Sequence, residues 1–160
     1  MELLFQELTG GLHDRRQLAV IIIRLVAATL LGAIVGLQRE HARKPAGLRT
    51  HTLVSLGTAL LVLAGSEFGM SSDGLSRVIQ GIVTGIGFVG AGSILKLNEK
   101  REIHGLTTAA GLWMTAAIGV TVGLGAIGLA IIGTTFLLVV LALEVVEEIW
   151  RKNRQDQGNQ

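Results

Sequence analysis

The stretch Leu18–Leu37 reads LAVIIIRLVAATLLGAIVGL, and its only charged residue is Arg24. A helix of about 20 mostly apolar residues is long enough to cross the hydrocarbon core of a bilayer. The apolar run is too long for the h-region of a signal peptide, and it lacks a small-x-small cleavage end. We therefore predict a transmembrane helix that remains in the mature chain.

Four more apolar runs follow, separated by short polar connectors. Short connectors force neighbouring helices to run antiparallel. The last two runs form one long apolar stretch divided only around Gly123-Leu124-Gly125, so four or six spans are the alternatives to five. The sequence predicts an all-α integral membrane protein, a bundle of five transmembrane helices within residues 18–146. The predicted spans are 18–37, 48–68, 75–97, 105–124 and 125–143.

The composition agrees with a membrane protein. Hydrophobic residues make up 49% of the 160 residues and charged residues 16%, with a mean hydropathy of +0.57. Soluble domains carry about 25% charged residues. The absence of Cys excludes disulfides and thiolate metal sites. The net charge is only +2, so we expect lipid rather than nucleic acid as the surrounding partner.

Lysine and arginine gather at one end of the predicted bundle. Cytoplasmic loops of membrane proteins carry an excess of these residues. We therefore predict an N-terminus outside, a cytoplasmic C-terminus and a location in the bacterial inner membrane. The basic residues of the cytoplasmic side are Arg39, Arg43, Lys44, Arg49, Lys96, Lys100, Arg101, Arg151, Lys152 and Arg154; those of the outer side are Arg15, Arg16 and Arg77.

The two ends of the chain are predicted to lie outside the bundle. Residues 1–17 form either a frayed tail or a short interfacial helix, because Leu4, Phe5, Leu8 and Leu12 would share one helical face. The last helix is expected to continue past the membrane. Residues 147–160 then form a polar cytoplasmic tail, and residues 153–160 are expected to be disordered because they lack apolar side chains.

Glycines recur at helical spacing inside the apolar runs. Residues 85–90 read GIGFVG, but this G-x-G-x-x-G pattern lies within a span and lacks the soluble context of a nucleotide site. Small residues at such spacing let helix backbones approach closely. We predict that 75–97 is the central, most tightly packed helix; unwinding over Gly85–Gly92, to expose carbonyls to an ion, is the alternative. The packing glycines are Gly32, Gly36, Gly81, Gly85, Gly87, Gly90 and Gly92, with Gly119 and Gly123 repeating the pattern.

A few polar side chains lie at the outer ends of the spans. Arg24, Glu67, Arg77 and Gln80 fall in one leaflet, which makes an Arg24–Glu67 pair with Gln80 nearby one interpretation. In the other, Arg24 extends to the headgroups and Glu67 is interfacial. All acids lie near span ends, which disfavours a midplane Mg²⁺ site. We therefore predict no cofactor, keep Mg²⁺ as the alternative and leave a metal site unassigned.

Two predicted cytoplasmic loops carry the remaining polar motifs. From residue chemistry alone, we interpret the basic residues of these loops as charges that set the membrane orientation and the remaining polar residues as helix caps. Thr107 or Thr108 would cap the fourth helix. No residue set suggests catalysis, so we predict that the protein is not an enzyme. The motif residues are Arg39, Glu40, Arg49, Thr50 and His51 in the first loop, and Thr107 and Thr108 in the second.

Four ordered motifs resemble the MgtC/SapB family. Its pattern is G-x-x-x-G-L-E-R-E, A-G-L-R-T-H, G-I-G-F-L-G-A-G and G-L-T-T-A-A-x-x-W. Here these segments are Gly32–Glu40, Ala46–His51, Gly85–Gly92 and Gly105–Trp113. Gln38 replaces the usual Glu, which weakens a metal role for that loop, and Val89 replaces the usual Leu. The resemblance covers the chain from about Leu18 to Leu143.

The resemblance implies an inner-membrane protein linked to growth at low magnesium and, in some pathogens, to virulence. Virulence-associated members carry a C-terminal soluble domain, and we expect this chain to be a short form without it. Some members bind the membrane part of ATP synthase. The resulting hypothesis is a non-enzymatic regulator that acts through helix contacts and forms a homodimer; the alternative is a transporter or channel for Mg²⁺ or another cation.

Overall fold

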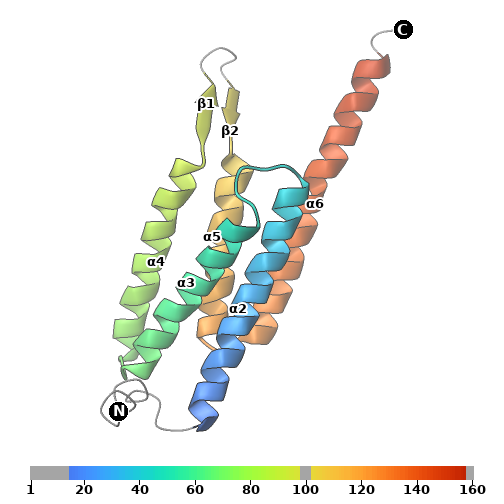
Figure 1. Cartoon of the computed structure of the whole chain (residues 1–160). Coiled ribbons are helices and arrows are strands. Elements are labelled where there is room, and N and C mark those ends of the chain that lie inside the picture. Colours follow the sequence, from blue (N-terminus) through green and yellow to red (C-terminus); the bar gives the residue numbers. More distant parts are fainter. Residues whose placement is uncertain (1–14, 98–101, 158–160) are drawn as a thin grey trace, which may run out of the picture.

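The computed structural model describes residues 15–97 and 102–157, with side chains described for 15–94 and 104–143. Figure 1 shows helices that alternate in direction, so that the α2–α3 connection and a small β-ribbon share one end. We call this the ribbon end, and the end with Arg15 the opposite end. The helices are α2 (Arg15–His41), α3 (Leu48–Glu67), α4 (Ser72–Gly92), α5 (Leu106–Gly123) and α6 (Ile127–Gln157). Of the predicted tail or interfacial segment, residues 1–17, residues 1–14 lie outside the described residues and residues 15–17 are the first residues of α2.

Four of these helices, α2 to α5, are long and apolar enough to cross a membrane. The apolar part of α6, Ile127–Leu143, is shorter, so the fifth span stays a prediction. Large apolar side chains cover the outer faces of α2 and α6, including Ile23, Leu129 and Phe136. Water would penalise such a surface, whereas lipid would not. The described chain is therefore a multi-pass helical bundle of the membrane class.

The connection between α4 and α5 differs from the prediction. Helix α4 ends at Gly92, where the Ser93 hydroxyl donates 2.7 Å to the Gly90 carbonyl. Strands β1 (Leu95–Leu97) and β2 (Glu102–His104) then pair antiparallel. A helix through residue 97 was therefore wrong, and the all-α prediction missed this ribbon. Alternating apolar and polar residues in both three-residue strands favour pairing over a further helical turn.

The other helix boundaries agree within a few residues, with one correction at the C-terminal end. Gly125, with φ of 90°, makes the turn between α5 and α6. Helix α6 continues to Gln157, so residues 153–157 are helical rather than disordered.

Helix α5, not α4, lies at the centre of the described bundle. It packs against α2, α3, α4 and α6, whereas α4 packs against α3 and α5 alone among the larger contacts. The most buried apolar side chains include Leu112 and Val122 of α5. The prediction that the glycine-rich third helix is central was wrong, because glycines allow a close approach without supplying a neighbour.

Two pairs of glycines do bring helices together. A Cβ on Gly36 would lie 2.6 Å from Leu48 Cα, and one on Gly119 only 2.2 Å from the Ser55 carbonyl oxygen. Gly32 and Gly123 are similarly tight against α3. In α4, by contrast, a Cβ on Gly90 would lie an ordinary 3.5 Å from the Ala109 side chain and one on Gly74 would meet only the adjacent turn, while Gly81, Gly85, Gly87 and Gly92 face open space.

Candidate functional site

Polar side chains from three helices meet inside the ribbon end of the bundle. Arg39 of α2, His51 and Ser55 of α3, and Thr108 and Thr115 of α5 are all buried. We call these five residues the polar core cluster. The sequence analysis grouped Arg39, His51 and Thr108 with the cytoplasmic loop motifs, although the predicted spans 48–68 and 105–124 already contained His51 and Thr108. Only Arg39 was placed beyond the end of its span, at Leu37; that placement was wrong, because α2 continues through His41 and carries this side chain into the bundle.

Arg39 is fully buried and joins α2 to α5. Its Nη2 atom donates a hydrogen bond of 3.1 Å to the Thr108 hydroxyl oxygen. Taking a guanidinium out of water costs several kcal/mol unless polar partners replace the lost hydration. The partnership therefore ties the position of Arg39 in one motif to that of Thr108 in another.

His51 joins α3 to α5 in the same cluster. Its Nδ1 atom lies 2.8 Å from the Thr115 hydroxyl, which in turn donates to the Gly111 carbonyl at 2.8 Å. The bond to Gly111 uses the only hydroxyl proton of Thr115. The proton between Thr115 Oγ1 and His51 must therefore be on Nδ1 of His51, which donates to Thr115. The ring Nε2 and the Ser55 hydroxyl are buried and have no hydrogen-bond partner among the described residues.

Thr115 and Ser55 were missed by the sequence analysis. Ser55 follows His51 by four residues and Thr115 follows Thr108 by seven, which places each pair on one helical face. Polar residues at helical spacing within apolar helices are the signal that could have found them.

Glu40 lies next to Arg39 but has a different environment. It is exposed, and its Oε2 accepts the backbone N–H of Leu48 at 3.0 Å, so a carboxylate of α2 caps the start of α3. An open cavity of about 500 Å³ beside it is lined in part by Arg49 and Thr50. Thr107 is exposed, and neither it nor Thr108 caps α5; the N-cap is Gly105, with φ of 96°.

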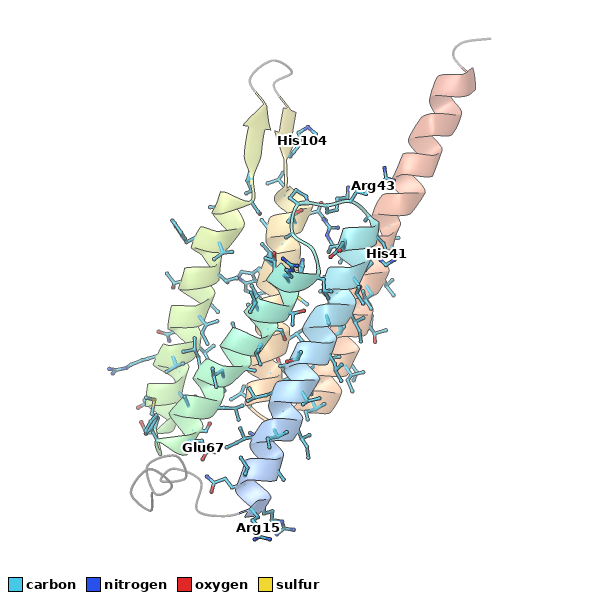
Figure 2. The ribbon with its side chains drawn as sticks, in the orientation of Figure 1. Arg15, His41, Arg43, Glu67 and His104 are labelled. Carbon is cyan, nitrogen blue, oxygen red and sulfur yellow. The ribbon has the colours of Figure 1, made fainter. Side chains whose placement is uncertain are left out.

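The opposite end of the bundle has its own polar cavity of about 320 Å³, between α2 and α3. Arg24 and Glu67 both line it, but these two described side chains form no ion pair. Arg24 Nη1 instead donates 3.0 Å to the Gly123 carbonyl, and Glu67 accepts a hydrogen bond from Gln17. Figure 2 shows Glu67 and Arg15 at this end, far from His41, Arg43 and His104 at the ribbon end.

Arg77 and Gln80 do not join Arg24 and Glu67. Both are exposed on α4 and neither lines the cavity. The Gln80 side chain donates within its own helix, 3.5 Å to the Ser76 hydroxyl.

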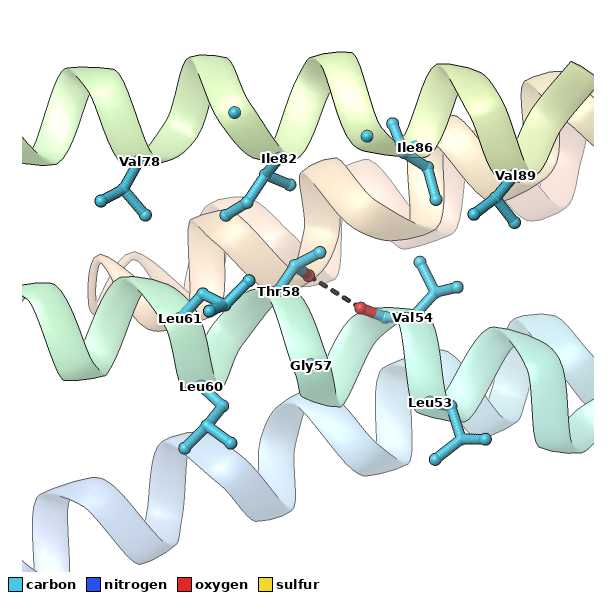
Figure 3. A pocket seen from close by; sticks show the side chains of 12 residues that line it. Leu53, Val54, Gly57, Thr58, Leu60, Leu61, Val78, Ile82, Ile86 and Val89 are labelled. Atoms are coloured by element: carbon cyan, nitrogen blue, oxygen red, sulfur yellow. Dashed lines mark hydrogen bonds between the residues drawn. The ribbon is translucent and has the colours of Figure 1, made fainter.

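An apolar groove of about 700 Å³ separates α3 from α4 (Figure 3). Its walls carry Val54, Leu61, Ile82 and Val89, and Gly85 opens onto it. Thr58 turns its hydroxyl back to the Val54 carbonyl at 2.9 Å. Helix α4 is continuous through Gly92, so the alternative of unwinding over Gly85–Gly92 was wrong.

Among the described residues, no three His, Asp or Glu side chains gather in a set that could hold a metal ion. The described acids Glu40, Glu67 and Asp73 are each exposed at a helix end.

Comparison with known proteins gives consistent matches. The MgtC family matches residues 25–149. Protein SrpB of Synechococcus elongatus is 43% identical over 130 residues, covering 74% of this chain and 71% of that protein. The putative magnesium transporter YhiD of Escherichia coli is 45% identical over 131 residues, covering 77% and 60%. Protein MgtC of Salmonella typhimurium is 42% identical over 127 residues, covering 79% and 53%. The chain thus spans between about half and about seven tenths of these relatives. No solved structure matches.

Proposed function

This chain belongs to the MgtC family, and from that premise we propose that it is a non-enzymatic regulator in the bacterial inner membrane. It acts in adaptation to magnesium limitation, through contacts with other membrane proteins. The membrane part of ATP synthase is the first partner to test, because some members of the family bind it.

The observation that carries this proposal is the burial of Arg39. Among the described buried side chains, Arg39 is the charged one, and it lies where α2, α3 and α5 meet. A buried guanidinium repels a divalent cation strongly, because charges interact over longer distances in a medium of low dielectric constant. Its hydrogen bond to Thr108 suits a fixed joint between helices, which favours a rigid scaffold over a cation path through this part of the bundle.

Magnesium flux and growth together test the proposal. The purified protein is reconstituted in liposomes that contain a Mg²⁺ indicator, and the gene is returned to a deletion strain on limiting magnesium. We expect restored growth and no flux above empty liposomes. Flux from folded protein would contradict the proposal.

The contact part of the proposal needs its own measurement. A photoactivatable residue at Phe88, exposed on α4, is compared with one at Leu112, buried in α5. We expect the probe at Phe88, but not that at Leu112, to cross-link to the membrane part of ATP synthase. Equal yields from both positions would contradict a specific contact.

A Mg²⁺ carrier is the second candidate, favoured by the name of the Escherichia coli relative, a putative magnesium transporter. It predicts flux that the Arg24→Ala, Glu67→Ala double variant loses, because these two charges line the polar cavity at the opposite end.

A further inference from the structure

The outward face of α4 differs from the outward faces of α2 and α6, which carry large apolar side chains. Helix α4 lies at the edge of the bundle (Figure 1), with Ile82 and Ile86 buried against its neighbours. Its exposed face includes the polar side chains of Gln80 and Thr84. Because lipid tails cannot hydrogen-bond to such side chains, this face is suited to contact with another protein.

The polar and small residues of this face follow one line. They recur at alternating steps of four and three residues, and all are exposed. Such spacing is that of the a and d positions of a left-handed coiled coil, which keeps one line of residues against a neighbouring helix along its length. We call these residues the α4 seam: Asp73, Arg77, Gln80, Thr84, Gly87 and Ala91.

Gln80 brings an amide into the apolar part of the span. Its Cα lies about 12 Å along the axis from that of Ser72, in a helix of 21 residues that is about 31 Å long. Among the described residues its side-chain partner is the Ser76 hydroxyl at 3.5 Å, which is a long hydrogen bond. The Thr84 hydroxyl donates 2.9 Å to the Gln80 carbonyl within the same helix. The amide of Gln80 is therefore the group of the seam that has hydrogen-bonding capacity for a second helix.

A second copy of the chain complements each part of the seam. Copies of a membrane protein share one orientation, so a two-fold axis along the membrane normal brings equal residues together at equal depth. Gln80 then meets Gln80 of the second copy, and the pair is self-complementary because an amide both donates and accepts. Near the end of the span, Asp73 of one copy lies one helical turn from Arg77 of the other, so opposite charges meet.

We propose that the α4 seam is the contact between two copies of this chain, with the two α4 helices packed in parallel. Gly87 and Ala91 let the backbones approach closely in the half of the helix toward the ribbon end. A Cβ on Gly87 would meet nothing within 4 Å in the single chain, so this part of the face is open to a neighbour. The groove between α3 and α4, with Gly81 and Gly85 in its lining, stays outside the contact.

Disulfide cross-linking in membrane vesicles tests the proposal, because the chain has no cysteine of its own. Thr84→Cys is compared with Val83→Cys and Gly85→Cys, which are exposed at the same depth but face other directions. A disulfide requires Cβ atoms about 3.5–4.5 Å apart. We expect oxidation to convert Thr84→Cys to a covalent dimer and to leave both neighbouring variants monomeric. Gly87→Cys, the next position of the seam, should also cross-link.

The contribution of Gln80 is measured separately, by energy transfer between labelled copies in liposomes of increasing lipid content. Gln80→Leu should raise the dissociation constant about three- to tenfold, the range expected for one hydrogen bond between membrane helices. Val83→Leu, at an exposed residue outside the seam, is the matched control and should leave the constant unchanged.

The absence of a disulfide at both residues 84 and 87 in folded protein would overturn the proposal, as would equal yields at 83, 84 and 85. Cross-linking of Thr84→Cys to a different protein in place of a second copy would overturn it too. An unchanged dissociation constant in Gln80→Leu would remove the amide from the contact and contradict the seam as described. Each outcome is independent of whether the protein moves magnesium.

Discussion

His51 and Thr115 join α3 to α5 through a hydrogen bond of 2.8 Å between two fully buried side chains. The bond fixes the ring of the last residue of one family motif against the helix that begins with another. Two further atoms of this region, Nε2 of His51 and Oγ of Ser55, are buried without a described partner. The polar core cluster is therefore sensitive to the loss of a single hydroxyl.

Thr115→Val should destabilise the protein by about 1–3 kcal/mol, because the Nδ1–H group of His51 would remain buried without an acceptor. The measurement is thermal unfolding in detergent, followed by circular dichroism. Thr135→Val is the matched control: Thr135 makes the same backbone contact as Thr115, 2.9 Å to the Ile131 carbonyl, but is exposed. An equal loss in both variants would argue against the contribution of His51.

Thr108→Val should cost a similar amount, about 1–3 kcal/mol, because it removes an acceptor from a buried guanidinium. Its neighbour Thr107 is exposed, so Thr107→Val should change the free energy of unfolding by no more than about 0.5 kcal/mol. Urea or SDS titration of both purified variants gives the comparison. Indistinguishable variants would mean that the Arg39–Thr108 bond adds no stability.

Gly119→Ala should destabilise the protein by about 1–3 kcal/mol through overpacking, since the new Cβ would lie 2.1 Å from Thr58 Oγ1 and 2.2 Å from a backbone oxygen. Gly85→Ala meets nothing within 4 Å and should stabilise α4 by up to about 1 kcal/mol, the difference in helix propensity. Opposite shifts of the melting temperature check this pair. A large loss from Gly85→Ala would instead reveal a close neighbour at the α4 groove.

Glu40→Ala should cost about 0.5–2 kcal/mol, because it removes the cap on the Leu48 N–H. Gly47 is the N-cap of α3 and has extended backbone angles, and a Cβ there would approach Glu40. Glu40→Ala frees the space that a serine side chain at residue 47 needs. Adding Gly47→Ser to Glu40→Ala should therefore restore part of the lost stability, because the serine hydroxyl can accept a hydrogen bond from the first turn of α3. Thermal unfolding of the single and double variants measures the recovery, and a double variant less stable than Glu40→Ala would contradict the capping role.

Cysteine labelling should establish the orientation of the bundle. The chain has no cysteine, so Ser71→Cys and Arg43→Cys each introduce a single thiol at opposite ends. With the N-terminus outside, a membrane-impermeant maleimide should label Ser71→Cys in spheroplasts and Arg43→Cys only after permeabilisation. The reverse pattern would overturn the orientation predicted from charge.

The sequence predicted the helices well because apolar runs of sufficient length have few alternatives in a membrane. It placed the functional motifs less well. A span was ended at Leu37 where polar residues begin, yet α2 continues to His41 and carries Arg39 into the bundle. A polar residue is expected to lie in water unless a buried partner accepts or donates its hydrogen bonds. The partner of Arg39 is Thr108, which is 69 residues away, so the residues next to Arg39 give no sign of the contact.

Tertiary placement also explains the errors at α4. Its glycine spacing matches that of helices that pack closely, but spacing along one helix carries no information about its neighbours. The two strands after it were missed because three residues are too few for alternation to be distinguished from the end of an apolar run.

The light packing of α4 has a consequence for how the protein opens. Helix α4 packs mainly against α3 and α5, and from residue 81 onward it carries five glycines, which supply no side chain to hold it in place; they are Gly81, Gly85, Gly87, Gly90 and Gly92. Native proteins unfold in cooperative units of unequal free energy. Backbone amides of α4 should then exchange with deuterium well before those of α3 and α5. Helix α4 would be the first unit to unfold, while the helices packed around α5 remain folded.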